Sequence, residues 1–242
     1  PLMIDRLRSG VAAGALAGVA YWLFTWLVVS PVVRRLEHLA SHGGGHGHGV
    51  VHTVGEPTTA VVSAGSGVLW GILLGAAFGV AYHLFEPGLP GRELKPYILA
   101  GAGFLIISVA PGTVLPPATP GMEPLYGPSL RVPLYIGLVA VGGLVAATSI
   151  LGYARTRRAR GRGTGAFVAL LPLAALGLLS VVAPPTLTGG GALTGLSVAF
   201  RWLVGISQAT LWALIAVAFR RFDRRLDRRG TNSPTATARG AD

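Results

Sequence analysis

Five of the six histidines in this chain lie within fifteen residues, between His38 and His52. A neutral imidazole is the commonest protein ligand for transition metals, and its borderline softness suits cobalt, nickel, zinc and copper in the 2+ state. Glycines between the histidines let the backbone fold several rings around one ion. The stretch therefore predicts a metal-binding loop with these candidate ligands: Glu37, His38, His42, His46, His48 and His52.

The geometry of this loop is left open by its composition. A short His-rich tract indicates metal binding on composition alone. His38 and His42 are four residues apart and can share one face of a helix, whereas His46 and His48 lie in glycine-rich chain. The alternative interpretation is a solvated loop whose histidines only buffer charge.

The composition of the whole chain is that of an integral membrane protein. Of its 242 residues 51% are hydrophobic and 12% are charged, and the mean hydropathy is +0.60. A soluble domain carries more charge and fewer apolar residues than this. Several apolar runs reach the roughly 20 residues that a helix needs to cross a bilayer. We therefore predict an all-α, multi-pass protein of the cell membrane with about six transmembrane helices.

Several function classes are made unfavourable by the charge pattern and the missing motifs. The net charge of +11 would suggest nucleic acid in a soluble protein, but here the basic residues lie at the ends of apolar runs, where they set membrane topology. The predicted partner is the lipid bilayer, with no nucleic acid. There is no cysteine, hence no disulfide and no thiolate ligand. Paired carboxylates, a nucleophile-base spacing and a zinc-protease motif are also missing, so we predict neither an enzyme nor an organic cofactor.

Six apolar runs are predicted to span the membrane. They cover residues 9–29, 58–85, 96–110, 129–153, 165–182 and 196–219. Pro31 is expected to end the first run, and Pro111 to begin a proline-rich loop that reaches Pro128. The predicted organisation is a transmembrane domain over residues 1–222, which includes the His-rich loop at 37–56, and a basic, partly disordered cytoplasmic tail over residues 223–242.

Glycines recur every four residues in the first two runs. They are Gly10, Gly14 and Gly18 in the first, and Gly67, Gly71, Gly75 and Gly79 in the second. A stripe of small residues at this spacing lets the backbone of another helix approach closely. We therefore predict that the first two spans pack tightly against each other in antiparallel directions.

Five polar residues within or beside the spans are candidates for an ion pathway or for structural roles. They are His83, Glu86, Arg131, Arg201 and Gln208. His83 and Glu86 form either an inner ligand or relay site, or an interfacial pair that reaches toward water. An arginine in a span is costly, so Arg201 is expected to face the bundle or a water-filled cavity. A structural hydrogen-bonding role and a role in transport are both open for it.

The basic residues predict the orientation of the chain. With six spans and both termini in the cytoplasm, sixteen of the twenty lysines and arginines lie on the cytoplasmic side. This orientation places the His-rich loop, the proline-rich loop and the uncharged glycine-rich loop at 183–195 together on the extracytoplasmic face. A metal-binding loop on that face fits the capture of an ion before uptake.

Several motifs resemble the CbtA family of probable cobalt transporter subunits. The first span of that family is similar to two stretches here, Leu7-Arg8-Ser9-Gly10 and Ala13-Gly14-Ala15-Leu16-Ala17-Gly18. The proline at Pro31, the carboxylate of Glu37 and the histidine loop that follows also resemble the family. Its connection between spans three and four resembles Pro116-Pro117 with Arg131-Val132-Pro133-Leu134-Tyr135, and its last span resembles Phe200-Arg201, Gln208 and Trp212. The resemblance covers roughly Leu7 to Phe222, and Leu115 departs from it because the family often has Asn there.

Membership of this family implies uptake of cobalt linked to vitamin B12. The substrate would be a divalent transition metal, cobalt first, with nickel or zinc as alternatives. The resemblance also implies a small, single-span, His-rich partner of the CbtB type, and a homo-oligomer is a further alternative. The rival function is a non-transporting accessory subunit of a larger complex, in which the glycine stripes and proline loops would be docking surfaces.

Overall fold

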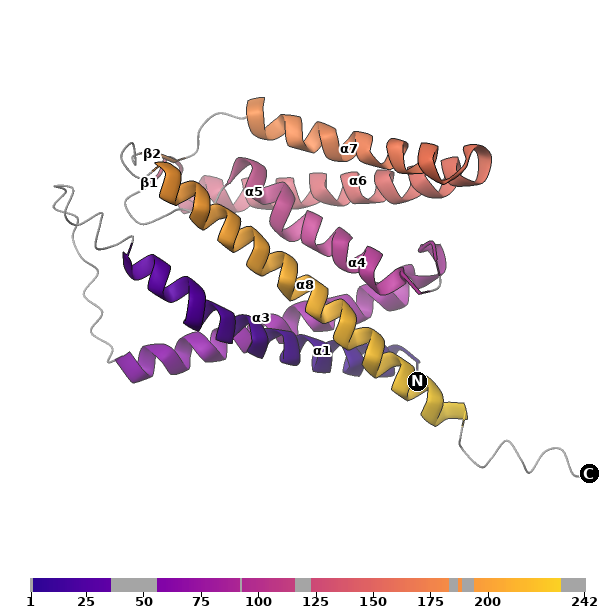
Figure 1. Cartoon of the computed structure of the whole chain (residues 1–242), viewed down its shortest axis with the longest axis horizontal. Helices are drawn as coiled ribbons and strands as arrows, with labels where there is room; N and C mark the ends of the chain where they lie inside the picture. The colour runs from indigo at the N-terminus through magenta and orange to yellow at the C-terminus, as the bar shows by residue number, and fades with distance from the viewer. Residues whose placement is uncertain are drawn as a thin grey trace, which may run out of the picture. The chain divides into compact units, whose positions relative to one another are not determined.

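The structure is a computed structural model that describes residues 2–35, 56–91, 93–115, 123–182, 187–188 and 194–231. Nearly all of these residues are helical (Figure 1). The α-helices are α1 (Leu2–Phe24), α3 (Glu56–Phe85), α4 (Lys95–Phe104), α5 (Ala110–Val114), α6 (Pro128–Arg160), α7 (Arg162–Val182) and α8 (Thr194–Thr231). Within the described ranges six helices are long and apolar enough to cross a membrane. The predicted all-α membrane fold is confirmed, while the orientation of the termini stays a prediction.

Two spans contain a π-helical segment that ends two residues before a proline. The first segment is η1 (Thr25–Val29), before Pro31, and the second is η3 (Leu105–Val109), before Pro111. A proline inside a helix lacks an N–H and crowds the carbonyl four residues earlier. The wider π-turn shifts that carbonyl, so the helix can continue past the proline.

The sequence-based ends of these two spans were therefore wrong. Residues 30–35 remain helical after η1, and α5 continues from η3 to Val114. A third end also differs, because α8 continues to Thr231 and includes the first part of the segment that was predicted as a tail from residue 223. Residues 232–242 lie outside the described part of the chain.

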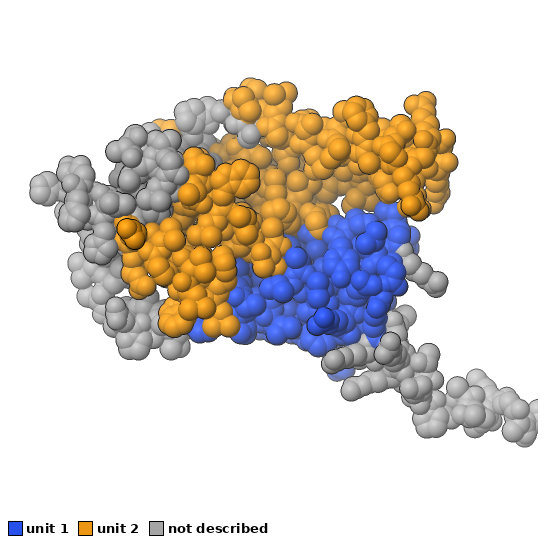
Figure 2. All heavy atoms as spheres, viewed as in Figure 1, with its two compact units in different colours: residues 1–22, 60–100, 211–242 blue, residues 23–59, 101–210 orange. Residues whose placement is uncertain are grey.

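The helices divide into two compact units, which Figure 2 colours separately. Unit 1 comprises Pro1–Trp22, Ala60–Ala100 and Leu211–Asp242, and unit 2 comprises Leu23–Thr59 and Gly101–Thr210. Unit 1 contains most of the fully buried side chains. Its core residues include Ala13, Ala17, Leu74, Phe78, Leu211, Ile215 and Phe219. Many large apolar side chains outside this core are exposed, as expected for helices that face lipid.

Unit 2 is built on the antiparallel pair α6 and α7, which pack along each other. Gly127 precedes Pro128, the first residue of α6, where the missing proline N–H costs nothing. At the other end Gly161, with a φ of +91°, turns the chain directly into α7. A Cβ on Gly152 would lie 3.1 Å from the Cγ1 atom of Val168, so the two helices are close there.

The other end of unit 2 holds a short antiparallel pair of strands, β1 (Glu123–Pro124) and β2 (Leu187–Thr188). β1 belongs to the proline-rich loop, and β2 belongs to the glycine-rich loop. Two spans, α6 and α7, separate these loops in the sequence, so both loops must emerge on the same side of a membrane. Their pairing agrees with the predicted six-span topology.

Candidate functional site

The predicted metal-binding loop lies outside the described residues. This applies to Glu37 and to all five histidines between His38 and His52. The predicted residues that the structure does describe fall into two groups. The glycine stripes and the pair His83 and Glu86 lie in unit 1, whereas Arg131, Arg201 and Gln208 lie in unit 2.

The two glycine stripes face each other where α1 packs against α3. A Cβ on Gly14 would collide with the carbonyl oxygen of Gly71 and would lie 2.8 Å from the Cα atom of Gly75. A Cβ on Gly71 would lie 2.5 Å from the carbonyl oxygen of Gly14. The backbones of the two helices are therefore in direct contact at these positions.

The same register continues along the whole interface. Gly10 meets Gly75 and Gly79, while Gly18 meets the backbone at Gly67. Residue numbers rise along one helix as they fall along the other, so α1 and α3 run in opposite directions. The structure thus brings both predicted stripes together. Gly67 is the loosest contact, because a Cβ there would lie 3.4 Å from the Cβ atom of Trp22.

An aromatic cluster lies beside this interface. The ring centroid of Phe219 in α8 is 5.1 Å from that of Phe78 and 4.9 Å from that of Tyr82, both in α3. All three side chains are buried, and Phe219 is fully buried. Edge-to-face and tilted contacts of this kind stabilise a packed core beyond the area that they bury. The cluster fixes α8 against α3 close to the end of the apolar region.

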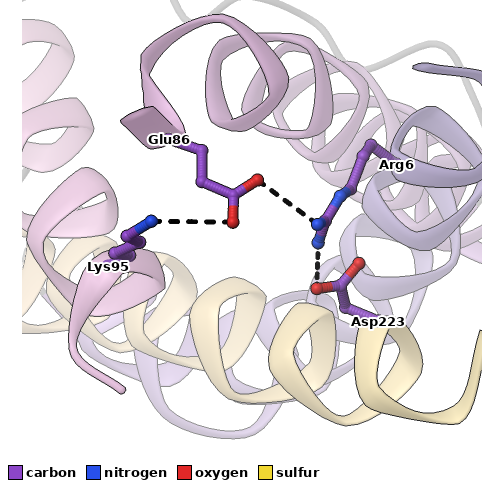
Figure 3. A network of polar contacts seen from close by, with 4 residues as sticks. All are labelled: Arg6, Glu86, Lys95 and Asp223. Atoms are coloured by element: carbon purple, nitrogen blue, oxygen red, sulfur yellow. Dashed lines mark hydrogen bonds and ion pairs between the residues drawn. The ribbon is translucent and has the colours of Figure 1, made fainter. Parts of the chain in front are cut away.

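A network of charged residues follows the aromatic cluster and joins four elements of unit 1 (Figure 3). Arg6 in α1 donates hydrogen bonds to Asp223 in α8 and to Glu86, the first residue of the 3-10 helix η2 (Glu86–Gly88). The bond to Glu86 is 3.3 Å long. The other oxygen of Glu86 lies 3.7 Å from the Nζ atom of Lys95, the first residue of α4.

Arg6 also connects the network to the aromatic cluster. Its guanidinium carbon lies 5.1 Å from the centre of the Tyr82 ring. Its side chain is 16% exposed, as is that of Asp223, while that of Glu86 is 33% exposed. Ion pairs on an open surface contribute about 0–1 kcal/mol, but partial burial weakens screening and makes the loss of one partner more costly.

A second set of ion pairs lies between α4 and α8. Glu93 pairs with Arg220 and Arg224 of α8, and Arg220 also donates to the hydroxyl of Tyr97 at 3.4 Å. The side chains of Glu93 and Arg224 are more exposed than those around Arg6. Together the two sets tie the beginning of α1, the end of α3, the beginning of α4 and the last third of α8 to one another. We call these residues the charged end of unit 1: Arg6, Glu86, Glu93, Lys95, Arg220, Asp223 and Arg224.

Glu86 takes part in two ion pairs. Among the described residues no three His, Cys, Asp or Glu side chains lie close enough together to hold one ion. His83 is half-buried on α3, one turn before Glu86. The observed contacts therefore favour the interfacial interpretation of Glu86, whose carboxylate is held between Arg6 and Lys95.

Arg201 and Gln208 are half-buried and seven residues apart on α8, so they lie on nearly the same face of the helix. Trp212, four residues after Gln208 on the same helix, is buried, with 5% of its surface exposed. Arg131 is half-buried in the first turn of α6.

Sequence reasoning missed most of the charged end. Arg6 and Lys95 were considered only as topology signals, and Asp223 was assigned to a tail. A usable signal was present, because Asp223 is the first acidic residue after Glu123 and follows the last apolar span directly. A carboxylate within a run of arginines at the end of a span is typical of an ion pair with another helix end.

Comparison with known proteins supplies one match. A family described as "Probable cobalt transporter subunit (CbtA)" matches residues 4–222. The comparisons with curated proteins and with solved structures find no match.

Proposed function

Because the chain belongs to the CbtA family of probable cobalt transporter subunits, we propose that it is the membrane subunit for uptake of divalent cobalt. Nickel and zinc are the alternative substrates, since imidazole ligands accept all three ions. The observation that carries the proposal is the family match over residues 4–222, which includes all six candidate spans except Met3 of the first and the last two residues of the sixth.

The His-rich loop is proposed to capture the ion on the extracytoplasmic face. Its support is the composition of residues 37–56 and the bias of basic residues toward the opposite face. The affinity of nitrogen ligands rises from cobalt to nickel to copper. The loop alone therefore cannot select cobalt, and selection must depend on the spans or on a partner.

We further propose that the charged end of unit 1 closes the cytoplasmic side of that unit in the observed state. The buried rings of Phe78, Tyr82 and Phe219 fill the end of the apolar region, and the ion pairs of Arg6 hold α1, η2 and α8 together. Release of an ion on this side would require these pairs to break.

The word subunit in the family description implies a partner. We propose a small, single-span, His-rich protein of the CbtB type for this role. A partner would supply metal ligands for the pathway. Among the described residues no three His, Cys, Asp or Glu side chains lie together where they could hold an ion. Ion relays within membranes usually rely on such ionisable groups.

The loop is tested by metal binding to the purified full-length protein. Equilibrium binding of cobalt, nickel, zinc and copper is measured for the natural protein and for a variant with His38, His42, His46, His48 and His52 all replaced by Asn. We expect the variant to lose at least tenfold in cobalt affinity, and a tenfold loss corresponds to about 1.4 kcal/mol of binding free energy. His83→Asn is the matched control and should bind cobalt as the natural protein does.

Two outcomes would overturn this part of the proposal. One is a natural protein that retains none of the four ions. The other is equal affinity in the natural protein and the five-histidine variant. Co-purification with an unrelated enzyme from native membranes, without any dependence on metal, would instead favour an accessory subunit that does not transport.

A further inference from the structure

Five arginines surround the corner where α6 turns into α7. They are Arg155, Arg157, Arg158, Arg160 and Arg162, and all five are exposed. The corner is compact, because Gly161 alone separates the two helices and its N–H donates to the carbonyl of Arg157 at 3.3 Å. Five positive charges are thus held on one short, well-defined turn, which we call the arginine corner.

One of these arginines is part of the corner's own packing. The guanidinium of Arg157 lies 5.8 Å from the centre of the Tyr153 ring. A Cβ on Gly165 would lie 3.2 Å from both the Cβ atom of Arg157 and the ring of Tyr153, so the missing side chain of Gly165 makes room for this pair. The other four arginines have no comparable contact within the described part of the chain.

The sequence on either side of the arginine corner contains no acidic residue. No acidic residue occurs between Glu123 and Asp223, a stretch that contains the whole of α6 and α7. None of the five arginines forms an ion pair with any residue that the structure describes. The basic residues Arg6, Lys95, Arg220 and Arg224 of unit 1, by contrast, all pair with Glu or Asp. The guanidinium groups of the corner are therefore available to an external anion.

Neighbouring side chains indicate the depth at which that anion lies. Leu151 is 51% exposed and precedes Arg155 by four residues, while Phe167 is 64% exposed and follows Arg162 by five residues. Leu170 and Leu171, one turn further, are also more than half exposed. Apolar side chains that face lipid one or two turns from the arginines place the guanidinium groups at the level of the phospholipid headgroups.

We propose that the arginine corner is a binding site for an anionic phospholipid, whose phosphate is held by the exposed guanidinium groups. A guanidinium presents paired N–H donors that match two oxygens of one phosphate. The apolar residues beside the corner would contact the acyl chains of the same lipid. A soluble acidic protein fits less well, because it would have no contact with these apolar side chains.

The proposal is tested with fluorescent phosphatidylglycerol, which is titrated onto the purified full-length protein in a neutral detergent. Each basic residue near an anionic headgroup contributes about 1 kcal/mol. We therefore expect the double variant Arg160→Gln with Arg162→Gln to bind the lipid roughly 10- to 30-fold more weakly. Raising the salt concentration should weaken binding by the natural protein, since the contact is electrostatic.

Two further variants separate a local site from a general effect of charge. Arg34→Gln with Arg35→Gln removes two exposed arginines elsewhere and should change the affinity less than about twofold. Arg160→Lys with Arg162→Lys retains the charge but removes the paired N–H donors, so its affinity should fall between that of the natural protein and that of the glutamine pair at the same positions, which also guards against a variant that fails to fold. Two results would overturn the proposal. One is an equal loss of lipid affinity in the variant at Arg160 and Arg162 and in the variant at Arg34 and Arg35. The other is binding of hexaglutamate without binding of phosphatidylglycerol.

Discussion

Arg6 joins several elements of unit 1 through one side chain. Its guanidinium contacts Asp223, Glu86 and the ring of Tyr82. The geometry explains how a charged residue can lie at 16% exposure at the end of an apolar helix. Two carboxylates and an aromatic face replace most of the water that it loses. The helices α1, α3 and α8 and the 3-10 helix η2 all contribute to the contacts of this side chain.

Replacing Arg6 with Gln should destabilise the protein. The change leaves Asp223 and Glu86 partly buried with one cation fewer, and we expect the free energy of unfolding to fall by about 1–3 kcal/mol. The shift is measured as the thermal midpoint of the purified protein in detergent. Arg8→Gln is the matched control, because Arg8 is exposed and has no ion pair with a described residue; it should change stability by less than about 0.5 kcal/mol. Equal midpoints for the two variants would show that the network does not hold the unit.

The ion pairs between individual residues could not be predicted from the sequence. His83 and Glu86 were predicted as either an inner ligand site or an interfacial pair, and the sequence did not indicate that Glu86 would pair with Arg6 and Lys95. Arg6 and Glu86 are eighty residues apart, and Arg6 and Asp223 are 217 apart. No local pattern encodes such distant pairs, which depend on how four helix ends meet.

Element pairing is the scale at which the sequence was most informative. The four-residue spacing of glycines in α1 and α3 gives each helix one face without side chains. Two such faces let the backbones of the two helices approach closely. The structure shows the backbones of Gly14 and Gly71 in direct contact. Helix ends were less predictable, because the π-segments η1 and η3 let helices continue past Pro31 and Pro111.

Gly14→Ala should separate α1 from α3. The added Cβ would collide with the carbonyl oxygen of Gly71, which is backbone and cannot rotate away. Overpacking of this kind costs about 1–3 kcal/mol or more. Gly65→Ala on α3 is the control, since a Cβ there meets nothing within 4 Å and alanine favours a helix. The idea fails if the thermal midpoint of Gly14→Ala matches that of the natural protein.

A second pair of variants tests the packing in unit 2. A Cβ on Gly142 in α6 would lie 2.8 Å from the Cβ atom of Ala110 and 3.0 Å from the Cα atom of Ile106. A Cβ on the adjacent Gly143 meets nothing within 4 Å. Gly142→Ala should therefore lower the thermal midpoint, and Gly143→Ala should leave it unchanged or raise it slightly. A reversed order of the two midpoints would contradict the observed register of α6 against η3.

The whole molecule is a six-span protein of the cell membrane whose two units carry their charge differently. In unit 1 the side chains of Arg6, Lys95, Arg220 and Arg224 pair with acidic residues of the same unit, whereas the five arginines of the arginine corner form no ion pair with any residue that the structure describes. The sequence predicted the number of spans because length and hydropathy suffice for that. It could not predict the division into units, which depends on contacts between distant helices.

The predicted orientation can be tested directly, because the natural chain has no cysteine. Single cysteines are introduced as Ser41→Cys in the His-rich loop and Ser233→Cys near the C-terminus. A membrane-impermeant maleimide should label Ser41→Cys in intact cells and Ser233→Cys only after permeabilisation. The reverse pattern would place the histidines in the cytosol and remove their role in capture.

Uptake of radiolabelled cobalt by intact cells of the native organism tests the central claim most directly. Cells without the chain are compared with cells that express the natural protein or the five-histidine variant, across limiting and saturating cobalt. The natural protein should restore uptake at all concentrations, and the variant should lose most of it at limiting cobalt while recovering at saturation. Uptake that is the same with and without the chain would contradict the account.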